Sequence, residues 1–103
     1  MYKRQANEGG YTIPPELGGH GIGTNLHEDP FIPNIGDSGK GDVLQDGALV
    51  AIEPIFSMGT DPRITQRDGE FAYRTADGAR AAHFEHTVLV TNEAPLIITG
   101  PMW

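Results

Sequence analysis

Glycine and proline interrupt this chain so often that no long regular helix fits between them. The 103 residues include 14 Gly and 8 Pro. Glycine favours turns, and proline ends helices because it has no backbone N–H group. No segment of about ten residues or more shows the period of an amphipathic helix. We therefore expect several antiparallel strands with hairpin connections and almost no helix.

The expected strands are the apolar or alternating stretches between these turns. Residues 48–59 form the most apolar run and predict a buried strand, and residues 81–91 are the longest strand candidate. Residues 20–28 predict a glycine-rich strand or bulge, and residues 71–75 a short alternating strand. Residues 29–42 contain two prolines and three glycines, which predicts a loop.

The first ten residues differ from the rest of the chain. The stretch MYKRQ has long polar side chains and no periodic continuation. We interpret residues 1–10 as a leader or a truncated lead-in and exclude them from the fold. Residues 11–103 are then long enough for one small domain.

The charge and composition exclude several classes of partner and site. The net charge is −7, with 14 acidic and 7 basic residues, so direct contact with nucleic acid or an acidic membrane surface is disfavoured. The absence of cysteine excludes disulfides and thiolate ligands and fits a cytoplasmic location. No apolar run approaches the roughly 18 residues of a membrane span. An acidic surplus is compatible with divalent cations.

Five side chains are candidates for one cluster. Glu53 lies inside an apolar stretch, where a lone carboxylate needs a partner. Strand alternation places His83 and Glu85 on the same side. A metal site would use imidazoles and carboxylates, which suit Mn, Fe, Co, Zn or Ni. The ordinary alternative is a histidine bonded to backbone and a glutamate that ends a strand. The candidates are His20, His27, Glu53, His83 and Glu85.

Three motifs in this order resemble bacterial-type methionine aminopeptidases of the pita-bread metallopeptidase group. They are GGHGIGTNLHEDPFIPN, LVAIEPIF and AAHFEHTVLVT. The resemblance implies an α+β fold with a curved antiparallel sheet, of which residues 11–103 form the C-terminal half. It also implies removal of N-terminal methionine from nascent proteins by two-metal peptide hydrolysis, with a peptide N-terminus as the substrate.

The resemblance assigns roles to four of the candidates. His20 matches an imidazole ligand of one metal, and Glu53 matches a carboxylate ligand of the same metal that is also a possible general base. Glu85 matches the carboxylate that bridges both metals. His27 matches the histidine that polarises the scissile carbonyl. These matches predict that His20, Glu53 and Glu85 bind metal and that His27 and Glu53 take part in catalysis.

The same resemblance places a methionine pocket beside these residues. Leu26, Phe71 and His83 fall where the family lines the pocket or its rim, together with His27. Phe71 stands where many members have tryptophan, so this chain departs from the family there. A pocket selective for shape discriminates each excluded methylene by about 1–3 kcal/mol.

A second departure concerns the metal ligands. The family uses two aspartates upstream of the GHG motif, and residues 1–19 contain no aspartate. We therefore expect at most one metal here instead of two, and an incomplete, inactive chain. A truncated sheet would also leave an exposed edge that favours self-association.

Two other functions stay open. One is a non-catalytic module that binds a partner or a single metal. The other is a relative of the proline-specific aminopeptidases, which share the GHG, HE and EP motifs. That branch usually continues EPG, whereas Ile55 follows Pro54 in this chain, and the last motif is FEHT. Both features are more similar to methionine aminopeptidase.

Overall fold

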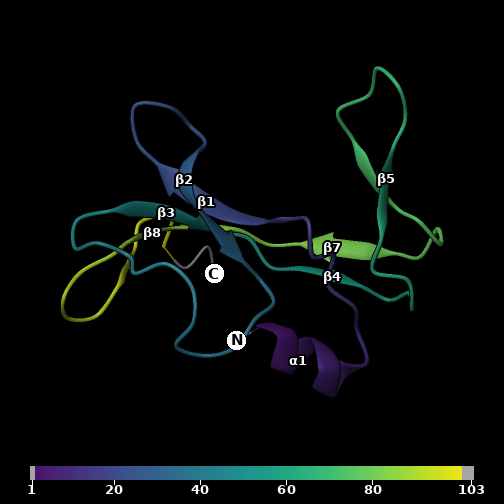
Figure 1. The fold of residues 1–103 in the computed structure, drawn as a ribbon, viewed down its shortest axis with the longest axis horizontal. Coiled ribbons are helices and arrows are strands. Elements are labelled where there is room, and N and C mark those ends of the chain that lie inside the picture. Colours follow the sequence, from purple (N-terminus) through teal and green to yellow (C-terminus); the bar gives the residue numbers. More distant parts are fainter. Residues whose placement is uncertain (1, 101–103) are drawn as a thin grey trace.

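The computed structural model describes residues 2–100, and antiparallel strands make up most of it (Figure 1). The largest sheet has five strands, and all of its pairings are antiparallel. This confirms the expected antiparallel architecture. In spatial order the strands are β2 (Glu28–Pro33), β1 (Gly18–Ile22), β3 (Leu49–Ile52), β8 (His86–Leu89) and β9 (Leu96–Ile97).

Two smaller two-stranded sheets complete the strand structure. β4 (Ile55–Ser57) pairs with β7 (Ala81–His83), and β5 (Ile64–Gln66) pairs with β6 (Tyr73–Thr75). The β4–β7 pair lies directly after the β3–β8 pair along the same two stretches of chain. The sheet therefore continues past β3 and β8 after a short interruption.

The two longest expected strands are present, but each is divided. The stretch 48–59 contains β3 and β4, and the stretch 81–91 contains β7 and β8. The first division falls at Glu53 and Pro54, because proline cannot donate a hydrogen bond to a neighbouring strand. The second falls opposite it, where the N–H of Phe84 donates to the carbonyl of Pro54 at 3.1 Å.

The expected loop over residues 29–42 is wrong at its beginning, because β2 occupies its first five residues. Pro30 and Pro33 suggested a loop, but β2 is an edge strand, where a missing N–H group is tolerated. Its partner β1 has a register shift between His20 and Gly21, and the glycine-rich strand or bulge expected over residues 20–28 is a strand only as far as Ile22. A Cβ atom at residue 21 would lie 2.1 Å from the carbonyl oxygen of Asp29, so only glycine fits there.

The exclusion of the first residues from the fold is wrong. Tyr2–Gly9 form helix α1, in which Ala6 is 1% exposed. The sequence of this segment is mostly polar, and Ala6 is its buried residue. The N–H of Tyr11 donates to the carbonyl of Ala6 at 2.7 Å, which ties the helix to the following strand region. The domain boundary at residue 10 stays a prediction.

The core is small and is centred on β3. Val50 and Ala51 of this strand are 1% and 0% exposed, and β3 lies between β1 and β8 in the sheet. Many large apolar side chains are exposed instead, among them Leu96 and Ile97 of the edge strand β9. Self-association through such an edge stays a prediction.

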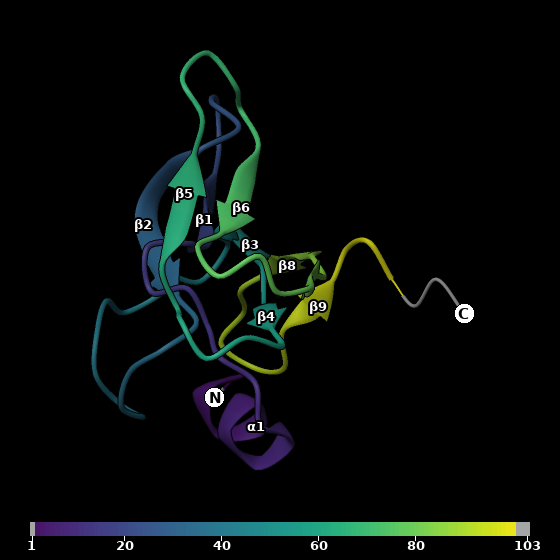
Figure 2. The ribbon, with the colours of Figure 1, turned by 90° about the vertical axis from the view of Figure 1, so that its right-hand side faces the viewer.

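Two hairpin tips project in the same direction from the sheet. Figures 1 and 2 show the loop between β1 and β2 and the β5–β6 hairpin rising on the same side, with α1 on the opposite side. None of the helices described in residues 2–100 is long and apolar enough to span a bilayer.

Candidate metal centre

The interruption between the two strand pairs brings two carboxylates together. Ile52 pairs with His86 on one side of the interruption, and Ile55 pairs with His83 on the other. Glu53 therefore lies opposite residues 84 and 85, outside regular pairing. At such a position the side chains are free of strict strand alternation, so Glu53 and Glu85 can turn toward a common point.

His20 reaches the same point from the neighbouring strand. It pairs with Ala51, two residues before Glu53. Its Nε2 lies 2.9 Å from Glu53 Oε1, and the two side chains are only 14% and 17% exposed. Its Nδ1 lies 2.8 Å from the carbonyl oxygen of Gly21, and because a carbonyl only accepts, Nδ1 carries the hydrogen. This bond orients the imidazole and directs Nε2 into the cluster.

His20, Glu53 and Glu85 each offer a donor atom within 4.8 Å of the others, and together they make up the cluster. One imidazole and two carboxylates form a donor set that suits a divalent transition metal. In the described part of the chain, every ion pair of an arginine joins it to a carboxylate other than these two. Among residues 2–100, Glu53 and Glu85 make their ion pairs with imidazoles, and the chemistry of the donors fits a bound cation.

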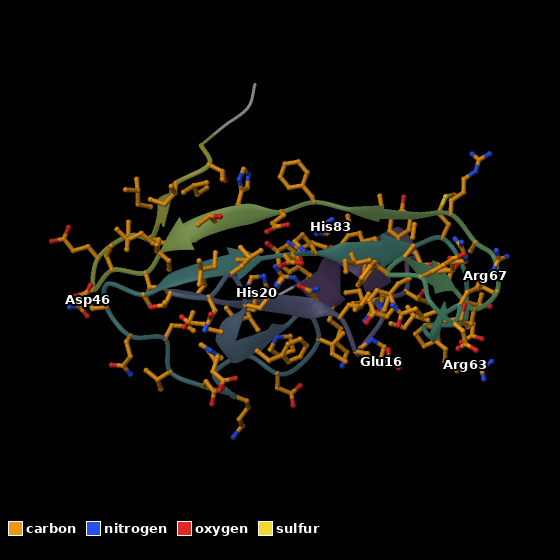
Figure 3. The ribbon with its side chains drawn as sticks, turned by 90° about the horizontal axis from the view of Figure 1, so that it is seen from above. Glu16, His20, Asp46, Arg63, Arg67 and His83 are labelled. Carbon is orange, nitrogen blue, oxygen red and sulfur yellow. The ribbon has the colours of Figure 1, made fainter. Side chains whose placement is uncertain are left out.

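His27 and His83 flank the cluster on different elements. The rings of His27 and His20 are tilted against each other, with centroids 4.3 Å apart. His83 Nε2 lies 3.6 Å from Glu53 Oε2 and 3.7 Å from Glu85 Oε2. Figure 3 shows His20 and His83 near the middle of the molecule. All five candidates for one cluster therefore lie together.

The expected pocket residues are more dispersed. Leu26 is 69% exposed in the loop between β1 and β2, and Phe71 is 97% exposed in the connection between β5 and β6. Neither lines the open, mainly apolar hollow of about 400 Å³ that lies beside His83. That hollow is lined by Tyr2, Gln5, Pro54, Phe56, Ala82, His83 and Phe84. The methionine pocket predicted from Leu26 and Phe71 stays a prediction.

Sequence reasoning missed a residue that positions the cluster. Asn34 is 4% exposed, and its Nδ2 donates to the backbone carbonyl of Glu53 at 2.7 Å. It follows edge strand β2 and fixes the backbone at the point where β3 ends. Asn34 belongs to the first quoted motif, but a short polar residue after proline predicts a turn and gives no sign of this contact.

Two carboxylates near β4, β5 and β6 have lowered pKa values. Hydrogen bonds from the Arg63 side chain and backbone lower the pKa of Asp61 to about 2. The N–H groups of Ala79, Asp61 and Thr60 donate to Asp77 and lower its pKa. Through these hydrogen bonds the half-buried Asp61 and the exposed Asp77 order the loops next to β4, β5 and β6.

Comparison with known protein sequences identifies a family and its named members. The model of metallopeptidase family M24 matches residues 2–92. The chain is 50% identical over 89 residues to methionine aminopeptidase 1 of Mycobacterium tuberculosis (strain CDC 1551 / Oshkosh), which is 86% of this chain and 33% of that protein. It is 43% identical over 96 residues to the methionine aminopeptidase of Aquifex aeolicus (strain VF5), covering 91% of this chain and 37% of the relative. The chain thus spans about a third of the length of these relatives.

Solved structures show the same relationship. The crystal structure of methionine aminopeptidase from Thermotoga maritima matches with a TM-score of 0.87 and 42% identity, over 95% of this chain and 39% of the other. That of methionine aminopeptidase from Rickettsia prowazekii matches with a TM-score of 0.86 and 31% identity, over 93% and 39%. The predicted pita-bread fold class and the resemblance to methionine aminopeptidases are confirmed. With the family model matching nearly all of its length, the chain belongs to metallopeptidase family M24.

Proposed function

We propose that this chain carries part of the metal centre of a methionine aminopeptidase, an enzyme that removes the N-terminal methionine of peptides and nascent proteins. The observation that carries the proposal is the convergence of one imidazole and two carboxylates at the interruption between β3 and β4. The relatives named methionine aminopeptidase support the substrate class.

His20, Glu53 and Glu85 would hold the metal. A bound divalent cation supplies a water of lowered pKa and stabilises negative charge on the carbonyl oxygen of the substrate. The Gly21 carbonyl holds the His20 ring with Nε2 directed at the cluster. Asn34 fixes the backbone of Glu53, so this carboxylate keeps its orientation and is placed to accept a proton from the attacking water.

His27 would act on the substrate and not on the metal. Its ring lies against that of His20, at the border of an open depression that also includes Glu28, Asp29 and Phe31. A peptide carbonyl bound there would be within reach of the His27 imidazole, which can donate a hydrogen bond to it. Leu26, in the loop between β1 and β2, and Phe71, in the connection between β5 and β6, are the residues that the resemblance assigns to the methionine side chain.

These 103 residues would not complete a two-metal centre by themselves. The resemblance places two aspartate ligands upstream of His20, and residues 1–19 contain none. We therefore expect the purified chain to bind a divalent cation without releasing methionine from a Met-Ala-Ser peptide in the presence of Mn²⁺ or Co²⁺. Turnover of this peptide by the chain alone would contradict the expected inactivity.

A chimera tests the function itself. The chain would replace the stretch of the Mycobacterium tuberculosis enzyme to which it is 50% identical, so that the rest of that enzyme supplies the missing ligands. We expect release of methionine from Met-Ala-Ser, and loss of release in the Glu53→Gln chimera. Glu70→Gln is the matched control, because Glu70 pairs with Arg74 away from the cluster.

The substrate panel of the chimera decides between the alternatives. Preference for a Xaa-Pro peptide would favour the proline-specific branch. A folded chimera that binds metal but cleaves neither peptide would favour a non-catalytic single-metal module.

A further inference from the structure

We infer that Asp68 is a site of spontaneous covalent modification, at which the chain forms isoaspartate through a cyclic succinimide made with Gly69. The inference does not depend on the proposed metal centre, and it concerns the connection between β5 and β6. Aspartate reacts in this way fastest when glycine follows it, because a side chain on the second residue hinders the approach of its backbone nitrogen. The chain contains three such pairs, which are Asp46–Gly47, Asp68–Gly69 and Asp77–Gly78.

The reaction needs nothing except the chain and water. The backbone nitrogen of Gly69 attacks Cγ of the protonated Asp68 side chain, so an N–Cγ bond forms and the Cγ–OH bond breaks. The hydroxyl leaves as water together with the proton of the Gly69 N–H group. Water then opens the ring at one of its two carbonyls. Cleavage of the N–Cγ bond restores aspartate, and cleavage of the original peptide bond leaves isoaspartate, whose backbone runs through Cβ and Cγ.

At the first pair, hydrogen bonds occupy both reacting groups. The Asn92 N–H group donates to Asp46 Oδ1 at 3.1 Å, which holds the carboxylate. The Gly47 N–H group donates to the carbonyl of Val90 at 2.8 Å, which holds the nitrogen. These bonds must open before the nitrogen can reach Cγ of Asp46, so we expect slow reaction at this pair.

The third pair is held in the same way. The Asp77 carboxylate accepts from three backbone N–H groups at 3.1 and 3.2 Å, and the Gly78 N–H group donates to the carbonyl of Thr75 at 3.3 Å. The bonds to the carboxylate, with that from the Ala79 N–H group the strongest cause, lower the pKa of Asp77. Its side chain is therefore less often in the protonated form that the nitrogen attacks.

At Asp68 neither reacting group is held. Within residues 2–100, the Asp68 carboxylate and the Gly69 N–H group make no hydrogen bond or ion pair. The turn is closed instead by the Glu70 N–H group, which donates to the carbonyl of Arg67 at 3.0 Å, and this bond leaves the central N–H group of the turn free. All three aspartates are exposed, so their bonding and not their exposure distinguishes Asp68, which lies on the projecting hairpin (Figures 1 and 2).

Incubation of the folded chain for weeks at neutral pH in ¹⁸O-labelled water tests the inference. Ring opening introduces the label, and electron-transfer dissociation in a mass spectrometer gives fragment ions specific for isoaspartate at each pair. We expect Asp68 to react at least about tenfold faster than Asp46 and Asp77, because bonds to a charged group oppose opening at the other two. In urea the three aspartates should react at similar rates, since unfolding removes these bonds.

A variant and a second host sharpen the test. Asp68→Glu closes a larger ring far more slowly, so label at residue 68 should disappear while the slow reaction at Asp46 and Asp77 is unchanged. The chimera described above carries the same hairpin, and the same order of rates is expected there. Equal rates at the three pairs in the folded chain and in the chimera would overturn the inference, and so would label that persists at residue 68 in Asp68→Glu.

Discussion

The carboxylates of the cluster and those near the β5–β6 hairpin have different kinds of partner. In the hairpin region three carboxylates have partners within the chain: Arg74 for Glu70, Arg63 for Asp61, and backbone N–H groups for Asp77. At the cluster, Glu53 and Glu85 face imidazoles, and Figure 3 shows Arg63 and Arg67 at the far end of the molecule.

This difference separates two ways in which carboxylates contribute to a fold. A hairpin carboxylate that is neutralised within the chain orders its own loop and needs nothing from outside. A cluster of carboxylates that lacks arginine or lysine is compatible with folding mainly if a cation or protons reduce its charge. The changes that follow test this contrast, from the largest expected effect to the smallest.

Replacing Gly19 by alanine, in the strand that carries His20, should cause the largest loss of stability. A Cβ atom there would lie 2.0 Å from the carbonyl oxygen of Ala51, so β1 and β3 could not pair as they do. We expect a loss of about 3 kcal/mol in the free energy of unfolding. Urea denaturation followed by circular dichroism measures it.

A hairpin glycine gives the control for this change. Gly69 has a φ of +76° and nothing within 4 Å of a built Cβ. Asparagine tolerates this conformation, so Gly69→Asn should cost about 1 kcal/mol or less. Equal losses for Gly19→Ala and Gly69→Asn would remove the claimed difference between the two regions.

Adding a divalent cation should stabilise the chain through the cluster alone. A ligand that binds only the folded state at a hundred times its Kd contributes about 2.7 kcal/mol. We expect Mn²⁺ or Co²⁺ to raise the melting temperature of the chain and of Glu70→Gln, but not that of Glu53→Gln. A rise that survives Glu53→Gln would place the binding site elsewhere.

Shortening the buried valine of β3 should destabilise the sheet that carries the cluster. Val50 is 1% exposed, and Val50→Ala removes its packing and leaves a small cavity, for a loss of about 2 kcal/mol. The control is Val43→Ala, because Val43 is 82% exposed and its shortening should change stability by about 0.5 kcal/mol or less. Chemical denaturation of both variants gives the comparison.

Lowering the pH should disorder the loops held by Asp61 and Asp77, and only at strongly acidic pH. The folded-state pKa values of Asp61 and Asp77 lie below the ordinary 3.8, and that of Asp61 is about 2. Their contribution to order is therefore fully present above pH 3.8 and is lost as the pH falls toward 2. NMR of the Asp61 carboxyl carbon follows this titration.

The cause of the Asp61 shift can be tested in the same spectrum. Arg63→Ala removes the guanidinium that holds the Asp61 pKa down, so the midpoint should move up toward 3.8. An unchanged midpoint in Arg63→Ala would show that the arginine is not the cause.

Short stretches of sequence predicted those strands that are indicated by alternation or by an apolar run. The alternation of residues 71–75 and the apolar runs 48–59 and 81–91 indicated strands, and strands are there. The glycine-rich stretch from His20 indicated a strand or bulge, and β1 carries a register shift between His20 and Gly21. The proline after Glu53 also marked where β3 ends, because a missing N–H is a property of the residue alone.

Tertiary contacts determined three features that no short stretch of sequence predicted. β2 forms despite Pro30 and Pro33 because it pairs with β1 along one edge only. α1 is short and mostly polar, and it belongs to the fold because the small side chain of Ala6 is buried. Asn34 holds Glu53 across 19 residues of chain, a contact that no short sequence window contains.

By itself, the sequence determined which chemistry is available: imidazoles and carboxylates, without thiols and with few cations nearby. Only the tertiary structure decided that these groups meet. The two strand interruptions lie opposite each other because β3 pairs with β8 and β4 with β7, and this pairing turns Glu53 and Glu85 toward the same point. The physical reason is that residue type sets what an atom can bind, whereas long-range hydrogen bonding sets which atoms are neighbours.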